Sequence, residues 1–170
     1  SGLSMVEKPE GQRVLVIAPH PDDDVIGCGG TIRLHRRLGH SVFILYLSDG
    51  ERGIKNMNPI KTAELRRVEA VRSSGHLDVP EENLFHLHLR DGDIINQSGT
   101  NYDFRSILEK ANPDIIYLPS FCEPQLMELL NKFPDHRFQV FSRETNLIRE
   151  EKHIQFMPVD RDLFARSMIG

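Results

Sequence analysis

Short runs of apolar residues alternate along this chain with longer segments in which apolar residues recur every three or four positions. The runs predict strands and the longer segments predict helices. Strands are expected at residues 13–18, 40–47, 84–89, 114–119, 138–141 and 154–159, and helices at 25–38, 60–75, 102–110, 124–133 and from 160 onward. This alternation predicts an α/β fold, a three-layer Rossmann-like sandwich with a mainly parallel sheet and right-handed crossovers.

The length of the chain favours one domain. At 170 residues it can bury a single sizeable core, and it shows no internal repeat or linker. We therefore expect one α/β domain over residues 1–170, with a loose polar lead-in at 1–12. Residues 124–170 form an atypical C-terminal part, and the chain ends inside a predicted helix, so a homo-oligomer is one way in which the fold could be completed.

Composition and charge exclude several classes of protein. A net charge of −4 and a pI near 6.0 argue against a nucleic-acid-binding protein. The longest apolar run, 42–47, is too short for a transmembrane segment, and the first residues lack the apolar core of a signal peptide. Two cysteines far apart in sequence, Cys28 and Cys122, form no disulfide framework, so we expect a cytoplasmic protein.

The stretch VLVIAPHPDDDVIGCGG, residues 14–30, changes the picture, because a buried strand ends in a histidine and three aspartates. In a doubly wound sheet the ligand site lies at the carboxyl ends of the strands where the strand order reverses, between the first and fourth strands. Carboxylates can also serve simply as caps at the start of the following helix. A cap needs only one of the three, whereas a divalent cation held by His20 and one aspartate would relieve their repulsion and leave another aspartate as a base. The two interpretations are compatible.

Several motifs together resemble a known family. PHPDDDVIGCGGTI, SDGERG after the second strand, ELRRVEAVRSSGHLDV, the Asp91-Gly92 turn and PDIIYLPS are similar to the PIG-L/LmbE family of zinc-dependent de-N-acetylases. The resemblance covers about the first two-thirds of the chain. It implies a hydrolase that removes an N-acetyl group from an N-acetylglucosamine-type sugar conjugate, with one bound Zn²⁺ ion.

Carried over by position, the resemblance assigns roles to five residues. It implies that His20 and Asp23 are metal ligands and that Asp22 is the general base. Asp24 stands where the family has a glutamate, in a supporting role near the substrate. Arg66 falls where family members hold a basic residue close to the substrate.

The third metal ligand stays open. The family motif implies His136, but this chain reads FPDHR, so that Phe133 replaces a second catalytic histidine. The predicted helix at 124–133 would also place His136 at the opposite edge of the sheet from the aspartates. Glu123 and Cys122, which follow the fourth strand, are alternatives at the correct edge.

The remaining histidines have plainer interpretations than metal ligands. His86 and His88 alternate with leucines along one predicted strand, so we expect that they cannot both face the same site and that one faces solvent. His35, His40, His76 and His153 lie at predicted element boundaries and are expected at the surface.

A rival hypothesis belongs to a different class. The chain would then be a non-catalytic or truncated α/β module of the same family with an incomplete metal site, which binds a sugar or a nucleotide-sugar.

Overall fold

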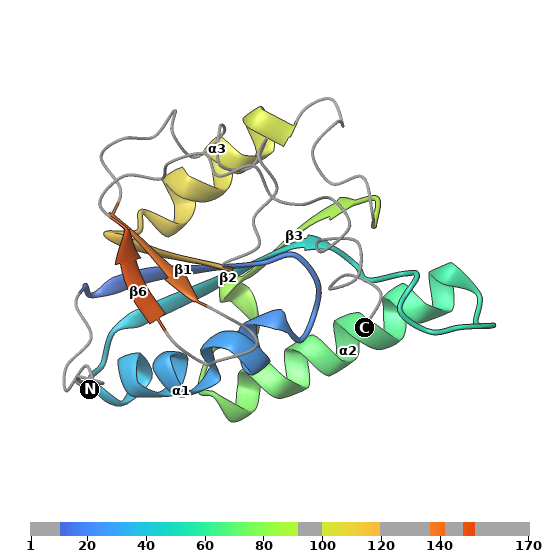
Figure 1. Ribbon diagram of the computed structural model, residues 1–170, viewed down its shortest axis with the longest axis horizontal. Coiled ribbons are helices and arrows are strands. Elements are labelled where there is room, and N and C mark those ends of the chain that lie inside the picture. Colours follow the sequence, from blue (N-terminus) through green and yellow to red (C-terminus); the bar gives the residue numbers. More distant parts are fainter. Residues whose placement is uncertain (1–10, 92–99, 120–136, 142–147, 152–170) are drawn as a thin grey trace.

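The computed structural model describes residues 11–91, 100–119, 137–141 and 148–151. Its elements follow the predicted order: β1 (Arg13–Ala18), α1 (Asp23–Arg37), β2 (Ser41–Ser48), α2 (Pro59–His76), a short 3₁₀ helix η1 (Glu81–Asn83), β3 (Leu84–Leu89), α3 (Thr100–Ala111), β4 (Ile115–Pro119), β5 (Arg137–Phe141) and β6 (Ile148–Glu151). The predicted α/β class is confirmed (Figure 1).

The strands form one sheet in the order β3-β2-β1-β4-β5-β6. The pairs from β3 through β5 are parallel, and β6 runs antiparallel to β5. From β1 the chain adds β2 and β3 on one side and then β4 on the other side, so the strand order reverses between β1 and β4. The predicted position of the switch point, between the first and fourth strands, is therefore confirmed.

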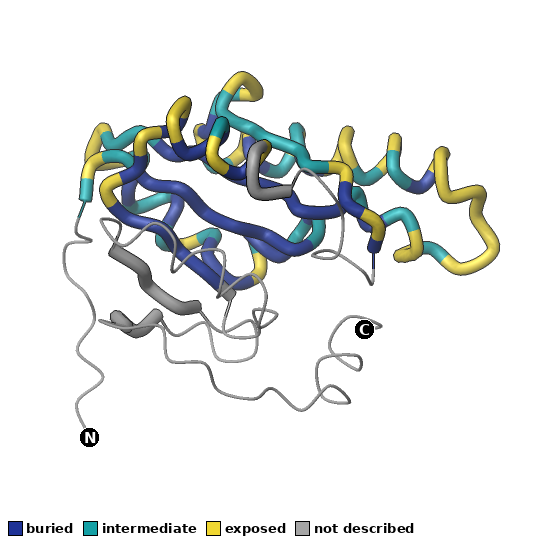
Figure 2. Tube along the Cα trace, turned by 90° about the horizontal axis from the view of Figure 1, so that it is seen from above, coloured by how far each residue is buried: buried dark blue, intermediate teal, exposed yellow. Residues whose placement is uncertain are grey.

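The helices lie on both faces of the sheet. In Figure 1, α3 covers one face and α1 and α2 cover the other. Successive residues of β1 alternate between the two faces, since Leu15 and Ile17 pack with the α3 side while Val14 and Val16 pack with the α1 side. Both faces are covered, and the central strands β1, β2 and β4 are accordingly nearly continuous apolar runs. Figure 2 shows the buried strands as a central layer, with exposure on the outer sides of the helices.

Element boundaries differ from the predictions mostly by one or two residues. The boundary that matters most for the site is the start of α1, which is Asp23 and not residue 25. Two of the three aspartates therefore lie inside the first helical turn. Strand β6 was not predicted. The predicted helices at 124–133 and from 160 onward, and the predicted strand at 154–159, lie outside the described residues. Within the described ranges, no helix has the length and apolar character needed to cross a membrane.

The prediction that His35 lies at the surface is wrong. The last turn of α1 packs against the sheet, and His35 is 0% exposed there. Its Nε2 lies 2.8 Å from the Tyr117 hydroxyl on β4, and its Nδ1 lies 2.9 Å from Nδ1 of His40, which is half-buried. Burial, with a smaller contribution from His40, lowers the pKa of His35 to about 4. His76 is exposed as predicted, and His153 lies outside the described residues.

The expectation that His86 and His88 cannot both face one site is not supported by the geometry of β3. Residues two apart on a strand point to the same face, and the two rings stack with their centroids 5.7 Å apart. The His86 ring also stacks on Tyr46 of β2. The side chain of His88 is 53% exposed, so the expectation that one of the pair faces solvent holds.

Candidate metal centre

The loop after β1 is tied to the end of β2. The carbonyl oxygen of Pro19 accepts hydrogen bonds from the backbone N–H of Ser48 at 3.0 Å and from its hydroxyl at 3.1 Å. Gly50, with φ +62°, leaves room for the Pro21 ring, which an added Cβ would approach to 3.4 Å. These contacts hold the HPDDD stretch at the carboxyl edge of the sheet, where the strand order predicts a ligand site.

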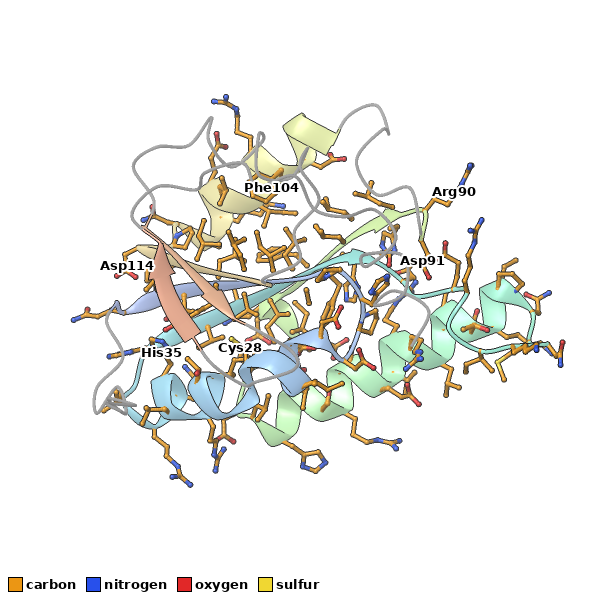
Figure 3. The ribbon with its side chains drawn as sticks, in the orientation of Figure 1. Cys28, His35, Arg90, Asp91, Phe104 and Asp114 are labelled. Atoms are coloured by element: carbon orange, nitrogen blue, oxygen red, sulfur yellow. The ribbon has the colours of Figure 1, made fainter. Side chains whose placement is uncertain are left out.

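His20 lies between two carboxylates. Its Nδ1 is 3.2 Å from Oδ2 of Asp23, and its Nε2 is 2.9 Å from Oδ1 of Asp91. Burial by itself lowers the pKa of His20, but the hydrogen bonds to both carboxylates outweigh it and raise that pKa to about 9. Figure 3 shows Asp91 at the end of the sheet opposite to Asp114 and His35.

Asp91 is the site residue that sequence reasoning missed. Its backbone N–H donates to Oε1 of Glu51 at 2.8 Å, which fixes the turn after β3 to the loop after β2. Burial by itself raises the pKa of Asp91, but the hydrogen bond from His20 lowers it below its ordinary value. The available signal was the Asp91-Gly92 turn, because it follows a strand at the same sheet edge as His20.

Asp22 adopts an unusual backbone conformation. Its φ of 102° is in the left-handed region, which is rare for residues other than glycine and occurs disproportionately at functional sites. Asp22 is the N-cap residue of α1, but its side chain makes no capping hydrogen bond. That side chain is 44% exposed, and its Oδ2 lies 4.0 Å from Nη1 of Arg66. The carboxylate is therefore accessible to solvent beside Arg66.

Arg66 reaches the site from α2. Its guanidinium also lies 3.6 Å from Oε2 of Glu69, one turn further along the helix. It packs directly against Gly53, where an added Cβ would come within 2.9 Å of Nη2. Arg66 therefore lies beside Asp22, and its role near a substrate stays a prediction.

Asp24 points into the core. It is 0% exposed, and its Oδ2 accepts a hydrogen bond from the Tyr46 hydroxyl at 2.9 Å. Oδ1 is buried without a hydrogen-bond partner among the described residues. Burial raises the pKa of Asp24 to about 6, although the Tyr46 hydrogen bond acts in the opposite direction. This burial favours a supporting role for Asp24 over direct contact with a substrate.

The spacing of His20 and Asp23 fits two ligands of one ion. Two tetrahedral zinc ligands with bonds of 2.0–2.2 Å lie about 3.4 Å apart, close to the 3.2 Å between His20 Nδ1 and Asp23 Oδ2. An imidazole nitrogen and a carboxylate oxygen are also donors that suit zinc. Asp91 faces the other ring nitrogen, so it cannot join this pair on the same ion. The part of the chain that the structure describes holds no group of three side chains able to bind a metal ion.

The predicted third ligand, His136, lies outside the described residues, as do the alternatives Glu123 and Cys122. Its assignment stays a prediction. The next residue, Arg137, begins β5 in register with Ile115, at the amino end of β4.

Comparison with known proteins connects this geometry to a family. Residues 15–142 match the family described as PIG-L, GlcNAc-PI de-N-acetylase. A diacetylchitobiose deacetylase of Thermococcus kodakarensis is 30% identical over 132 residues, which are 76% of this chain and 47% of that protein. The N-acetylglucosaminyl-phosphatidylinositol de-N-acetylase of Bos taurus is 32% identical over 81 residues, 48% of this chain and 29% of that protein. The chain thus spans about half of the first relative and less of the second.

A solved structure shows the same fold. The N,N′-diacetylchitobiose deacetylase from Pyrococcus horikoshii, in complex with an inhibitor, superposes with a TM-score of 0.66 at 23% sequence identity. The superposition covers 94% of this chain and 69% of that chain. Because the family match extends over 15–142 and includes the HPDDD stretch, the chain belongs to the PIG-L family.

Proposed function

We propose that this chain carries the site of a zinc-dependent de-N-acetylase, which hydrolyses the N-acetyl group of an N-acetylglucosamine-type sugar conjugate. The observation that carries the proposal is the position of His20 and Asp23, side by side at the strand switch point, with the outward-facing Asp22 between them in sequence. Family membership and the deacetylases among the relatives support the reaction class.

The described residues divide the chemistry between them. His20 Nδ1 and Asp23 Oδ2 would hold the ion. When bound, zinc polarises the amide carbonyl and lowers the pKa of a coordinated water from 15.7 to about 7. Asp22 accepts a proton from the attacking water, whose oxygen forms a bond to the carbonyl carbon. The C–N bond then breaks with proton transfer to nitrogen, so that acetate and the free amine leave.

Arg66 supplies positive charge beside the base. Its Nη1 lies 4.0 Å from Asp22 Oδ2, so its charge attracts this carboxylate and favours one orientation of it. Gly53 lies beside Nη2 and Nε of the guanidinium and Glu69 lies beside Nη1, so both limit where the group can move. A positive group here also suits a substrate with hydroxyl or phosphate oxygens next to the acetamido group.

The proposal is tested by acetate release from N,N′-diacetylchitobiose and from N-acetylglucosaminyl-phosphatidylinositol, with zinc content measured in the same samples. We expect Asp22→Asn to keep zinc and to lose about 10²–10⁴-fold in rate, as for removal of a general base. Asp23→Ala should lose both zinc and activity. Asp49→Asn is the matched control, because Asp49 lies at the same edge but pairs with His88 at 2.8 Å.

Two results would contradict the proposal. Wild-type protein purified without chelator that contains no zinc, and takes up none, would remove the metal from the mechanism. Stoichiometric zinc without acetate release from either substrate would contradict the hydrolysis. Sugar binding without zinc would indicate the rival, a non-catalytic module with an incomplete metal site.

A further inference from the structure

His20 has more carboxylate neighbours than a single ion can use. Asp23 faces one ring nitrogen and Asp91 faces the other. The two nitrogens of an imidazole point away from each other, so a cation at one of them leaves the other for a hydrogen bond. One nitrogen is therefore the metal ligand and the other is the hydrogen-bond donor. The distance from each nitrogen to its carboxylate, and the contacts that hold each carboxylate, decide between them.

The Nδ1 side fits the ion. The distance from Nδ1 to Asp23 Oδ2, 3.2 Å, is close to the spacing of two ligands on one zinc ion. The same Oδ2 accepts the backbone N–H of His20 at 3.0 Å, which fixes the Asp23 carboxylate beside that face of the ring. Asp23 and Nδ1 are thus presented together by one short segment of chain.

The Nε2 side fits a hydrogen bond. Asp91 Oδ1 lies 2.9 Å from Nε2, the usual distance for N–H···O. The Asp91 side chain is 11% exposed, so water competes little for this bond. Its backbone is anchored by the 2.8 Å hydrogen bond from its N–H to Glu51. Asp91 is therefore held in place from a different strand, independently of the HPDDD stretch.

We infer that Asp91 is a positioning residue. Its carboxylate accepts the Nε2–H of His20 and so selects the tautomer that presents the Nδ1 lone pair to the cation beside Asp23. The inference rests on the proposed function, in which that cation is present. A carboxylate on the second nitrogen orients a ligating histidine and increases its basicity, and its loss typically weakens metal affinity by about 10–100-fold.

The first experiment measures zinc affinity by chelator competition. We expect Asp91→Ala to raise the zinc Kd by about 10–100-fold. Asp91→Asn keeps an oxygen acceptor in place, so it should fall between Asp91→Ala and wild type. Asp49→Ala is the matched control, because it removes one negative charge and one carboxylate–histidine contact at the same edge without touching His20. Its Kd should stay within about threefold of wild type, since a more distant charge is largely screened.

The second experiment identifies the ligating nitrogen. Long-range ¹H–¹⁵N spectra of the zinc-loaded protein, labelled at histidine, distinguish a metallated from a protonated ring nitrogen. We expect His20 to have metal at Nδ1 and a slowly exchanging proton at Nε2, and we expect that proton to exchange faster in Asp91→Ala. If Asp91 had only a structural role, Asp91→Ala would lower the midpoint of unfolding without changing the exchange rate of the His20 Nε2–H proton.

The outcomes separate the two proposals. Metal at Nε2 in the wild type would overturn the inference, and so would an Asp91→Ala variant with wild-type Kd and unchanged Nε2–H exchange. Neither result would contradict zinc-dependent de-N-acetylation, although metal at Nε2 would also change the ligand atom that the proposed function assigns to His20. If Asp49→Ala weakens zinc as much as Asp91→Ala, net charge and not positioning is responsible, which also overturns it. A wild-type protein that binds no zinc overturns the proposed function, and the inference fails with it.

Discussion

The buried His35 should make the stability of this protein depend on pH. The pKa of His35 is lowered from 6.5 in the unfolded chain to about 4 in the folded protein, chiefly by burial. Between these values the unfolded chain binds a proton that the folded protein does not. Lowering the pH through this window therefore favours unfolding.

The size of the effect follows from the two pKa values. Each pKa unit corresponds to about 1.4 kcal/mol, so the full shift corresponds to roughly 3 kcal/mol once the pH is below 4. Between pH 7 and pH 5 the loss from His35 alone is about 2 kcal/mol. Above pH 6.5 the imidazole of His35 is neutral in both states, so His35 no longer makes the unfolding free energy depend on pH.

Urea unfolding at several pH values tests this. Other groups also titrate, among them Asp24, whose raised pKa acts in the opposite direction. We therefore compare wild type with His35→Gln, which has no titrating group, and expect the difference in unfolding free energy to change by about 2 kcal/mol from pH 7 to pH 5. His76→Gln, at an exposed position, is the control and should follow the wild-type profile.

Parallel pH profiles for wild type and His35→Gln would refute the reasoning. They would mean that His35 gains a proton in the folded state as easily as in the unfolded chain. The hydrogen bonds to Tyr117 and His40 would then compensate fully for burial of the imidazolium.

Two further predictions concern residues that support the site. Tyr46→Phe removes only the hydroxyl that donates to the buried Asp24. We expect the free energy of unfolding in urea to fall by about 1.5–3 kcal/mol, as for other hydrogen bonds to charged groups. A decrease below about 0.5 kcal/mol would contradict that hydrogen bond. Gly53→Ala places a Cβ within 2.9 Å of the Arg66 guanidinium, which must move; we expect acetate release to fall by roughly tenfold while zinc content is unchanged, since misplaced charge costs rate. Gly30→Ala is its control, because a Cβ at Gly30 would have no atom within 4 Å. The free energy of unfolding of this control should rise by about 0.5–1 kcal/mol, since alanine favours a helix more than glycine does. Equal rates of acetate release by the two variants would show that Arg66 can move without affecting the reaction.

Much of the fold was predictable because its signals are local. An apolar run such as 13–18 identifies a buried strand whatever its neighbours are, and helical spacing identifies the α1 and α2 segments. Right-handed α/β winding then limits the strand order, so the HPDDD stretch could be placed at the switch point before any coordinates. Strand β6 was missed because IREE carries no apolar alternation.

The sequence by itself therefore determined where His20, Asp22 and Asp23 lie, because one short segment delivers all three to the sheet edge. Only the tertiary structure decided their partners. Asp91 meets His20 across 71 positions of sequence, and Tyr46 of β2 meets Asp24 of α1. Such pairs depend on how strands and loops pack side by side, and periodicity along the chain contains no information about the distance between side chains on separate elements.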